Sequence, residues 1–335
     1  MTIVAGRAPG VMGGRGTRVQ RLRARALQGV TIAACRLPER PLLAAADSIG
    51  ELWYRATPAR AATARANLAR VCAWLAAEGR GPARARRAAS DPRALESLVR
   101  AAYRHLARYY VEALRAPTLN EDYVIERLEV TSPETVAASF SEPRGVIYIG
   151  SHLGPVEILA WLGGHERQGP VVGVMETVDD PELQAWMART RSGTGIELVG
   201  LGEARRRLRE AIELGGAALL VVDRDISGGG TEVELFGHPA PLPTGAAILA
   251  AETGAPVFWE AVVRVGDGRY RGWMREVPVP AEGRLRVRVA AFLDQTARLI
   301  EESVAQAPEQ WWAVFHPIWP DLDAAPGAGG SEGGG

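Results

Sequence analysis

The chain has 335 residues, enough to bury a large core in one large domain or two smaller ones. Its 39 basic and 39 acidic side chains give a formal net charge of zero, so total charge does not point to a particular partner. There is no lysine, which excludes P-loop nucleotide hydrolases and Schiff-base or pyridoxal enzymes, because these chemistries need a lysine amine. The two cysteines, Cys35 and Cys72, lie in apolar helical surroundings without metal-ligand spacing, which is typical of buried thiols in a reducing cytoplasm.

The first third of the chain is basic and has a helical pattern. Residues 1–120 hold 21 of the 39 arginines but only 7 of the 39 acidic residues. We expect the Gly-rich residues 1–17 to be disordered and residues 18–120 to be helical. The helices are predicted at residues 19–34, 40–54, 58–77 and 92–114.

The same region has features of a membrane-facing surface. The predicted helix over residues 92–114 carries an apolar stripe on one face and arginines on another. Nearby aromatic residues are of the types found at lipid interfaces: Trp53, Tyr54, Tyr109 and Tyr110. We therefore interpret residues 18–120 as a region that docks on an anionic membrane surface, and the alternative is a core-packed helix with solvated arginines. No apolar run reaches the roughly 18 residues that are needed to span a bilayer.

From residue 121 onward, strand and helix patterns alternate. Apolar runs predict strands at residues 146–149, 171–175, 197–199, 217–222 and 257–265. Helices are predicted between them, at about residues 156–163, 181–191, 203–214 and 245–253. This alternation predicts an α/β fold in residues 121–322, with a mixed, mainly parallel central sheet flanked by helices.

The end of this domain departs from the alternation. A turn at residues 266–268 adds an antiparallel strand over residues 270–276, and a helix over residues 287–305 follows. We expect the Trp-rich residues 309–319 to pack onto the core. The Gly-rich residues 323–335 are predicted to be disordered.

The most informative stretch is residues 145–164, where a buried strand ends just before His152 and Glu157 follows five residues later. Pro155 suits the first position of a helix, so Gly154 is the expected N-cap. Ligands of open α/β sheets bind at the carboxyl ends of the strands, which favours a catalytic role for His152. Two simpler interpretations compete: Glu157 could only complement the helix dipole, and His152 could only bond a backbone carbonyl.

A second polar group follows the strand at residues 217–222. Asp223, Arg224 and Asp225 end that strand, and a Gly-rich loop leads to residues 231–237, which include Glu232. Further along, Thr244 and Gly245 begin a helix whose N-terminus could hold a phosphate. Together these features predict a polar crevice.

Three other reaction classes fit this pattern poorly. An aspartate-based phosphatase would need a lysine. A serine hydrolase is disfavoured because Ser151 adjoins His152 outside a G-x-S-x-G pattern, and adjacent side chains of an extended segment point to opposite faces. A zinc site would need a second ligand near His152, and no suitable histidine is close in sequence.

With both groups in view, the chain resembles the bacterial lipid A biosynthesis acyltransferase family, within the wider glycerophospholipid acyltransferase group that shares an H-x4-D/E motif. The nearest likeness is to the phosphatidylinositol mannoside acyltransferase branch. The motif corresponds to His152 and Glu157, and residues 223–225, 232–237 and 243–245 resemble the family's downstream block. The likeness covers roughly residues 60–320. One departure is the pair Gly154 and Pro155, which stand inside the motif where the family usually has other residues.

The resemblance implies roles for these residues. His152 would be the general base that activates a lipid hydroxyl, with Glu157 as the first choice and Glu232 as the second choice for the carboxylate that orients it. Backbone N–H groups at the helix start near Gly154 would stabilise the oxyanion. Arg224 would hold phosphates of the donor or the lipid headgroup, and the alternative is an ion pair with Asp223 or Asp225.

The sequence thus predicts a peripheral membrane enzyme. It would move a fatty acyl chain from acyl-CoA or acyl carrier protein to a hydroxyl of a glycolipid or phospholipid, at the cytoplasmic face of the inner membrane. The crevice residues Asp223, Asp225, Thr244 and Gly245 would help to bind the substrates. No metal, redox cofactor or nucleic acid is expected. The alternatives are a non-catalytic lipid-binding protein of the same fold and an acyl-thioester hydrolase.

Overall fold

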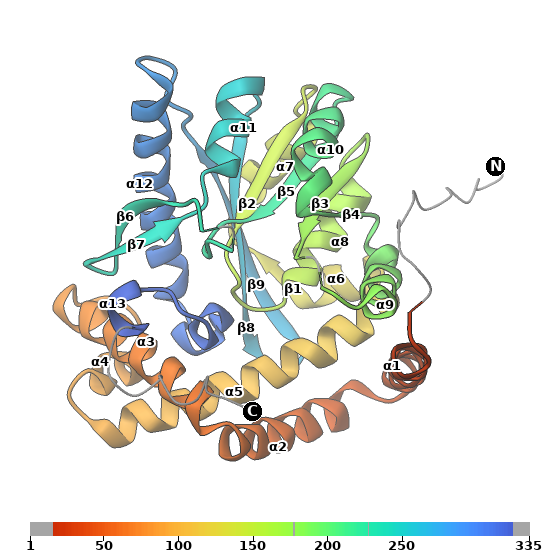
Figure 1. Ribbon diagram of the computed structural model, residues 1–335, viewed down its shortest axis with the longest axis vertical. Helices are drawn as coiled ribbons and strands as arrows, with labels where there is room; N and C mark the ends of the chain where they lie inside the picture. Colours follow the sequence, from red (N-terminus) through yellow and green to blue (C-terminus); the bar gives the residue numbers. More distant parts are fainter. Residues whose placement is uncertain (1–15, 177, 227, 324–335) are drawn as a thin grey trace, which may run out of the picture.

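The computed structural model describes residues 16–176, 178–226 and 228–323, without the side chain of Ser192 (Figure 1). The terminal stretches predicted to be disordered lie outside the described residues, except for Gly16, Thr17 and Asp323. Thr17 caps the first helix in a capping box, in which its side chain and that of Gln20 each accept from the other residue's backbone N–H.

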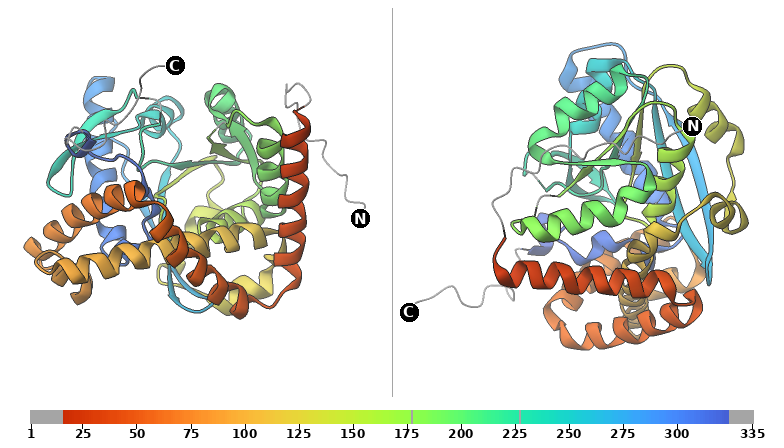
Figure 2. Two further views of the ribbon diagram at one scale, coloured as in Figure 1. Left: turned by 60° about the horizontal axis from the view of Figure 1, so that its bottom comes forward. Right: turned by 90° about the vertical axis from the view of Figure 1, so that its right-hand side faces the viewer.

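Five α-helices lie between residues 18 and 115 of the described chain, and four of them were predicted. They are α1 (Arg18–Arg36), α2 (Glu39–Ala56), α3 (Pro58–Ala77), α4 (Ala83–Ala88) and α5 (Pro92–Arg115). Only the short α4 was missed, because its six residues follow two glycines with positive φ and hold no full apolar period. Helix α2 packs along α5, and α1 crosses to pack against α5 and α9 (Pro181–Arg191), as Figure 2 shows.

Within the described residues, seven strands form one mixed sheet in the order β1-β9-β8-β2-β5-β3-β4. The predicted strands are all present, as β2 (Val146–Gly150), β3 (Val171–Met175), β4 (Glu197–Gly200), β5 (Ala217–Val221), β8 (Val257–Gly266) and β9 (Arg269–Val277). Strand β1 (Leu128–Val130) pairs with β9, and these two run antiparallel to the rest. The prediction of a mixed, mainly parallel sheet flanked by helices is confirmed.

Helices cover both faces of this sheet (Figure 1). One face packs against α10 (Leu201–Glu213), α11 (Gly245–Thr253) and α12 (Leu285–Val304), and its buried cluster continues into α3 and α5. The other face packs against α6 (Glu121–Arg127), α7 (Pro133–Ser141) and α8 (Val156–Glu166). The Trp-rich segment predicted to pack onto the core does so, since Trp311 and Trp319 are fully buried.

A separate two-stranded sheet was not predicted. Strands β6 (Thr231–Leu235) and β7 (His238–Leu242) form an antiparallel hairpin outside the main sheet. Pro239 and Pro241 lie in β7, and prolines argue against a strand unless it is an edge, as it is here. Short helical turns complete the chain: η1 (Ala116–Thr118), η2 (Ser192–Thr194), η3 (Pro308–Gln310), η4 (Trp312–Phe315) and α13 (Pro320–Asp323).

Two further expectations can be compared with the fold. Cys72 is buried, and burial raises the pKa of its thiol to about 12, whereas Cys35 is only partly buried. In the part of the chain that the structure describes, no helix has both the length and the apolar character to cross a membrane. The assignment of residues 18–120 as a membrane-docking region stays a prediction.

Candidate active site

The register of two neighbouring parallel strands brings His152 and Asp223 together. Gly150, the last residue of β2, pairs with Val221, the last residue of β5. His152 and Asp223 each lie two residues beyond these ends. As a result, His152 Nδ1 lies 2.6 Å from Asp223 Oδ1, and the backbone N–H of His152 donates to Asp223 Oδ2 at 2.8 Å.

The carboxylate of Asp223 also accepts a hydrogen bond from a third donor. The indole Nε1–H of Trp311 donates to Asp223 Oδ2 at 2.6 Å. Burial alone would raise the pKa of Asp223, but the positive charge on His152 and the hydrogen bonds from His152 and Trp311 hold this pKa below its ordinary value. Asp223 is therefore ionised when it accepts these bonds, and it fixes the imidazole with the proton on Nδ1.

The C-terminal segment holds the His152 loop from the other side. The backbone N–H of Trp312 donates to the His152 carbonyl at 3.0 Å, and that of Gly154 donates to the Gln310 carbonyl at 3.1 Å. The Trp312 ring lies edge-on to the imidazole, with 4.2 Å between centroids. The orientation of His152 thus depends on residues more than 150 positions later in the chain.

The start of α8 differs from the prediction by one residue. Pro155 occupies the N-cap, with φ −91° and ψ 77°, and the helix begins at Val156. Gly154 precedes it with φ +64°, a left-handed conformation that favours glycine. A Cβ at Gly154 would lie 2.1 Å from the carbonyl oxygen of Val262, so the loop can approach β8 this closely only with glycine.

Glu157, the acid of the motif, does not pair with His152. Its side chain is buried, and the Nε and Nη2 atoms of Arg191 each lie 3.3 Å from its Oε1. Arg191 Nη2 also donates to the Tyr109 hydroxyl at 3.1 Å. The expectation that Glu157 orients His152 is therefore corrected, because Asp223 takes that place and Glu157 holds Arg191.

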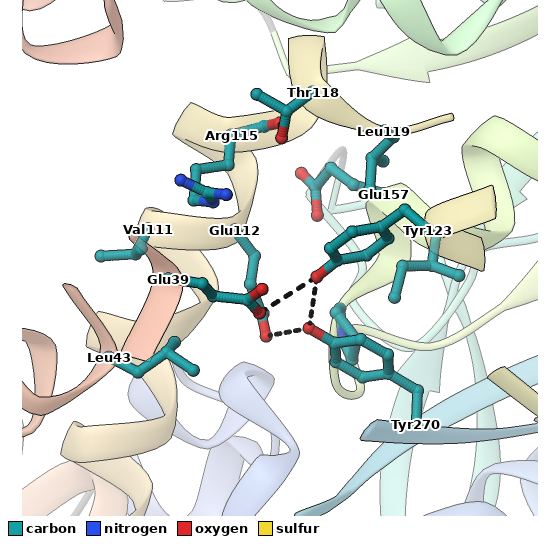
Figure 3. Close-up of a pocket in the computed structure, with 12 residues that line it drawn as sticks. Glu39, Leu43, Val111, Glu112, Arg115, Thr118, Leu119, Tyr123, Glu157 and Tyr270 are labelled. Carbon is teal, nitrogen blue, oxygen red and sulfur yellow. Dashed lines mark hydrogen bonds between the residues drawn. The ribbon is translucent and has the colours of Figure 1, made fainter. Parts of the chain in front are cut away.

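A small cavity of about 20 Å³ separates Glu157 from the N-terminal helices (Figure 3). On its far side, the Tyr123 hydroxyl donates to Glu39 at 3.1 Å and the Tyr270 hydroxyl donates to Glu112 at 3.3 Å. Figure 3 shows Glu157 projecting into this cavity, and its Oε2 has no hydrogen-bond partner. Burial raises the pKa of Glu157, although the charge of Arg191 opposes the shift.

His152 also lines a much larger cavity, of about 400 Å³, between α8 and the sheet. Nδ1 is occupied by Asp223, and Nε2 has no hydrogen bond to any described residue. The interior wall of the cavity is apolar and consists mainly of Leu159, Ala160, Gly173, Ile196, Leu198 and Leu219. Besides His152, four partly exposed basic side chains line the same cavity: Arg60, Arg191, Arg224 and His316. The arrangement can hold a long apolar group while a polar group faces His152.

The remaining predicted residues lie elsewhere. Glu232 is exposed on β6 and does not line this cavity, so it is not the partner of His152 either. Asp225 accepts from the N–H groups of Gly228 and Gly230, at 3.1 Å and 2.7 Å, and so shapes its own loop. Thr244 and Gly245 begin α11 as predicted, away from the cavity lining.

Sequence reasoning missed several residues that the fold brings to His152. Arg191, Tyr109, Arg60 and His316 carry no motif and come from four different segments. Trp311 was expected only as core packing, but its N–H reaches Asp223. Within the described residues, no group of three or more His, Cys, Asp or Glu side chains could hold a metal ion.

Comparison with known families decides the class of the protein. The family model for bacterial lipid A biosynthesis acyltransferases matches residues 25–320. The chain belongs to this family. In this member of the lipid A biosynthesis acyltransferase family, His152 lies two residues beyond the carboxyl end of β2. The resemblance found in the sequence is thereby confirmed.

Two relatives are acyltransferases by name. The chain is 28% identical over 232 residues to a phosphatidylinositol mannoside acyltransferase of Mycolicibacterium smegmatis, covering 67% of this chain and 73% of that protein. It is also 28% identical over 262 residues to the phosphatidylinositol mannoside acyltransferase of Mycobacterium tuberculosis, covering 76% of both chains. The family and these relatives together indicate an acyltransferase that acts on a lipid or glycolipid.

Proposed function

We propose that this acyltransferase moves a fatty acyl chain from a thioester of coenzyme A or acyl carrier protein to a hydroxyl of a membrane glycolipid or phospholipid. The observation that carries the proposal is the His152–Asp223 pair, 2.6 Å apart, at an apolar cavity of about 400 Å³. The fatty acyl chain would occupy the apolar interior beneath α8. The thioester carbonyl would then lie at the polar end of the cavity, next to His152.

In this mechanism His152 is the general base. Its Nδ1–H donates to Asp223, so Nε2 carries the lone pair that accepts the proton of the acceptor hydroxyl. The hydroxyl oxygen attacks the thioester carbonyl carbon, and the carboxylate of Asp223 stabilises the imidazolium that forms. When the tetrahedral intermediate collapses, the C–S bond breaks and the imidazolium returns its proton to the leaving thiolate. No proton, electron or further reactant is left over.

The negative charge of the intermediate also needs a partner. The backbone N–H groups of His152 and Gly154 are occupied by Asp223 and Gln310, so they do not serve the oxyanion. Arg191 lines the cavity and is held in place by Glu157 and Tyr109. We assign to Arg191, with the start of α8, the stabilisation of the oxyanion. In this arrangement Glu157 is a positioning residue.

The acceptor is proposed to be a phosphatidylinositol mannoside or a related glycolipid, because both relatives named above act on that class. The lipid would enter from a membrane on which the N-terminal helices dock. Ile49 and Leu52 on α2 are 55% and 67% exposed, and their neighbour Trp53 contacts Tyr110 at the cavity. Exposed apolar side chains near the substrate cavity, in an Arg-rich region, favour docking at the anionic cytoplasmic face of the inner membrane.

The test is acyl transfer from labelled palmitoyl-CoA into a bacterial lipid extract. We expect labelled lipid with the wild-type protein and essentially none with His152→Ala, and about a ten-thousandfold loss of rate with Asp223→Asn. Glu232→Gln should keep its activity, because Glu232 lies outside the cavity. Circular dichroism and thermal unfolding would show that each variant is folded.

The outcomes separate the alternatives. Labelled fatty acid without labelled lipid would indicate a hydrolase. Lipid binding without any turnover would indicate a non-catalytic protein of the same fold. Equal transfer by the wild type and folded His152→Ala would refute the role given to His152.

A further inference from the structure

Three basic side chains line the cavity around His152 without an acidic partner. Arg60 comes from α3, Arg224 follows β5, and His316 follows η4. No ion pair joins any of the three to a described acidic residue. Arg191, which lines the same cavity, does pair with a carboxylate, that of Glu157. Unpaired cations that are partly removed from water are costly, which suggests that a ligand supplies the missing charge.

Arg60 is held by aromatic rings rather than by a carboxylate. Its Cζ lies 5.1 Å from the ring centroid of Trp53 and 5.1 Å from that of Phe315. Cation–π contacts position the guanidinium and leave its N–H groups available as donors. The side chain is thus oriented toward the cavity before any ligand arrives.

Arg224 is free of both acidic residues that flank it. Asp223 binds His152 and Trp311, and Asp225 binds the backbone of its own loop. Arg224 forms no ion pair with either neighbour, so the predicted alternative of such a pair is not what the structure has. Its guanidinium remains as a donor beside His152.

His316 lies close enough to both arginines to respond to their charges. The Asn67 side chain donates to the His316 carbonyl at 2.9 Å and to the Val314 carbonyl at 2.8 Å, which fixes this segment against α3. Burial lowers the pKa of His316 to about 4, and the charges of Arg224 and Arg60 add to this shift. The imidazole is neutral near pH 7 and has one N–H donor. A bound anion would favour protonation of the other ring nitrogen, which gives a second N–H donor.

We propose that Arg60, Arg224 and His316 form a subsite for a phosphate ester, beside the acyl cavity and next to His152. Two guanidinium groups and an imidazole match a phosphate group, whose several oxygens accept from fork-shaped donors. Three acidic side chains line the cavity as well, but none forms an ion pair with these basic residues: Glu157 binds Arg191, Glu176 is exposed, and burial raises the pKa of Glu260 to about 8. The inference rests on the proposed function, because both substrates of such a transfer carry phosphate: the phosphopantetheine arm of the donor and the headgroup of the acceptor.

The kinetic test uses the full chain with Arg60→Gln, Arg224→Gln and the double variant. Each single change should lower kcat/KM about tenfold to a hundredfold, since it removes a charge-assisted hydrogen bond to phosphate. Arg286→Gln is the matched control, because Arg286 is exposed on α12, far from the cavity lining. The effect should vanish with a substrate that lacks the recognised phosphate.

Two truncated substrates identify the source of the phosphate. If the donor supplies it, the variants and the wild type will use palmitoyl-pantetheine equally well. If the acceptor supplies it, they will be equal with a phosphate-free glycosyl diacylglycerol. A loss that persists with both truncated substrates, or no loss with the natural ones, would overturn the subsite.

A binding measurement keeps this inference separate from the proposed reaction. Titration of inorganic phosphate, followed by NMR of the His316 ring protons, should give a saturable shift in the wild type and in Arg286→Gln. The double variant should show none. Saturable binding in a protein that transfers no acyl group would leave the phosphate subsite standing while the proposed function failed. Equal shifts in the double variant would refute the subsite.

Discussion

The buried carboxyl of Glu260 should make the stability of the protein depend on pH. Glu260 lies on β8 beside Gly150 and lines the cavity that contains His152. No hydrogen bond or ion pair joins its carboxyl to a described residue, and burial raises its pKa from 4.5 to about 8. We therefore expect Glu260→Gln, which keeps the shape but cannot ionise, to be more stable than the wild type near neutral pH.

The sign and size of this pH dependence follow from the linkage between proton binding and folding. A carboxyl whose pKa is raised by folding favours the folded state most below the unfolded pKa, and this contribution is lost as the pH rises from about 4.5 toward about 8. Each unit of pKa shift corresponds to about 1.4 kcal/mol, so the wild type should lose roughly 4 kcal/mol of unfolding free energy across this window through Glu260. The variant should lack this part of the pH dependence.

The measurement is urea unfolding at several pH values between about 5 and 8. The quantity to compare is the difference in unfolding free energy between wild type and variant, because burial also raises the pKa of Glu157 and Glu309 in both proteins. Glu282→Gln, at an exposed position, is the control and should leave the curve unchanged. If Glu260→Gln follows the wild-type curve throughout, the carboxyl is not desolvated and the reasoning fails.

Other predictions concern the site and its support. Trp311→Phe keeps the packing of an aromatic ring but removes the donor to Asp223, so kcat should fall about tenfold, and an unchanged kcat in a folded variant would remove Trp311 from the site. Glu157→Gln should lower kcat by less than Asp223→Asn does, because it acts only through the arginine that it holds; equal losses would contradict this order. Gly154→Ala should lower the free energy of unfolding by about 2–4 kcal/mol in thermal melts, because Gly154 has a positive φ and no room for a Cβ. The control is Gly163→Ala on α8, where a Cβ would meet no neighbour, and it should leave this free energy equal or raise it by up to about 1 kcal/mol.

The sequence predicts the elements of this fold well where a local pattern of apolar residues determines the secondary structure. Apolar runs and helical periods locate the six predicted strands and most helices, because each signal lies within a few consecutive residues. Elements without such a signal were missed. The hairpin β6–β7 contains two prolines in one strand, and β1 has only three residues.

The sequence could not predict the partner of His152, and the reason is different. Asp223 lies 71 residues away, and it meets His152 only because β5 is the strand beside β2. Strand order cannot be read from an alternation of strands and helices, so the nearest carboxylate, Glu157, was the natural choice. The prediction that ligands bind at the carboxyl ends of the strands was nevertheless the correct guide to the location of the cavity.

The bonds from residues 310–312 to the His152 loop have a consequence for biosynthesis. A nascent chain that ends near residue 300 already contains His152 and Asp223, as well as every strand of the main sheet. It lacks the indole that donates to Asp223 and the backbone groups that bind the loop. Such an intermediate would hold an unfinished base beside an open apolar cavity. Acyl transfer should therefore begin only after synthesis has passed Trp312, when the C-terminal segment has docked on the sheet.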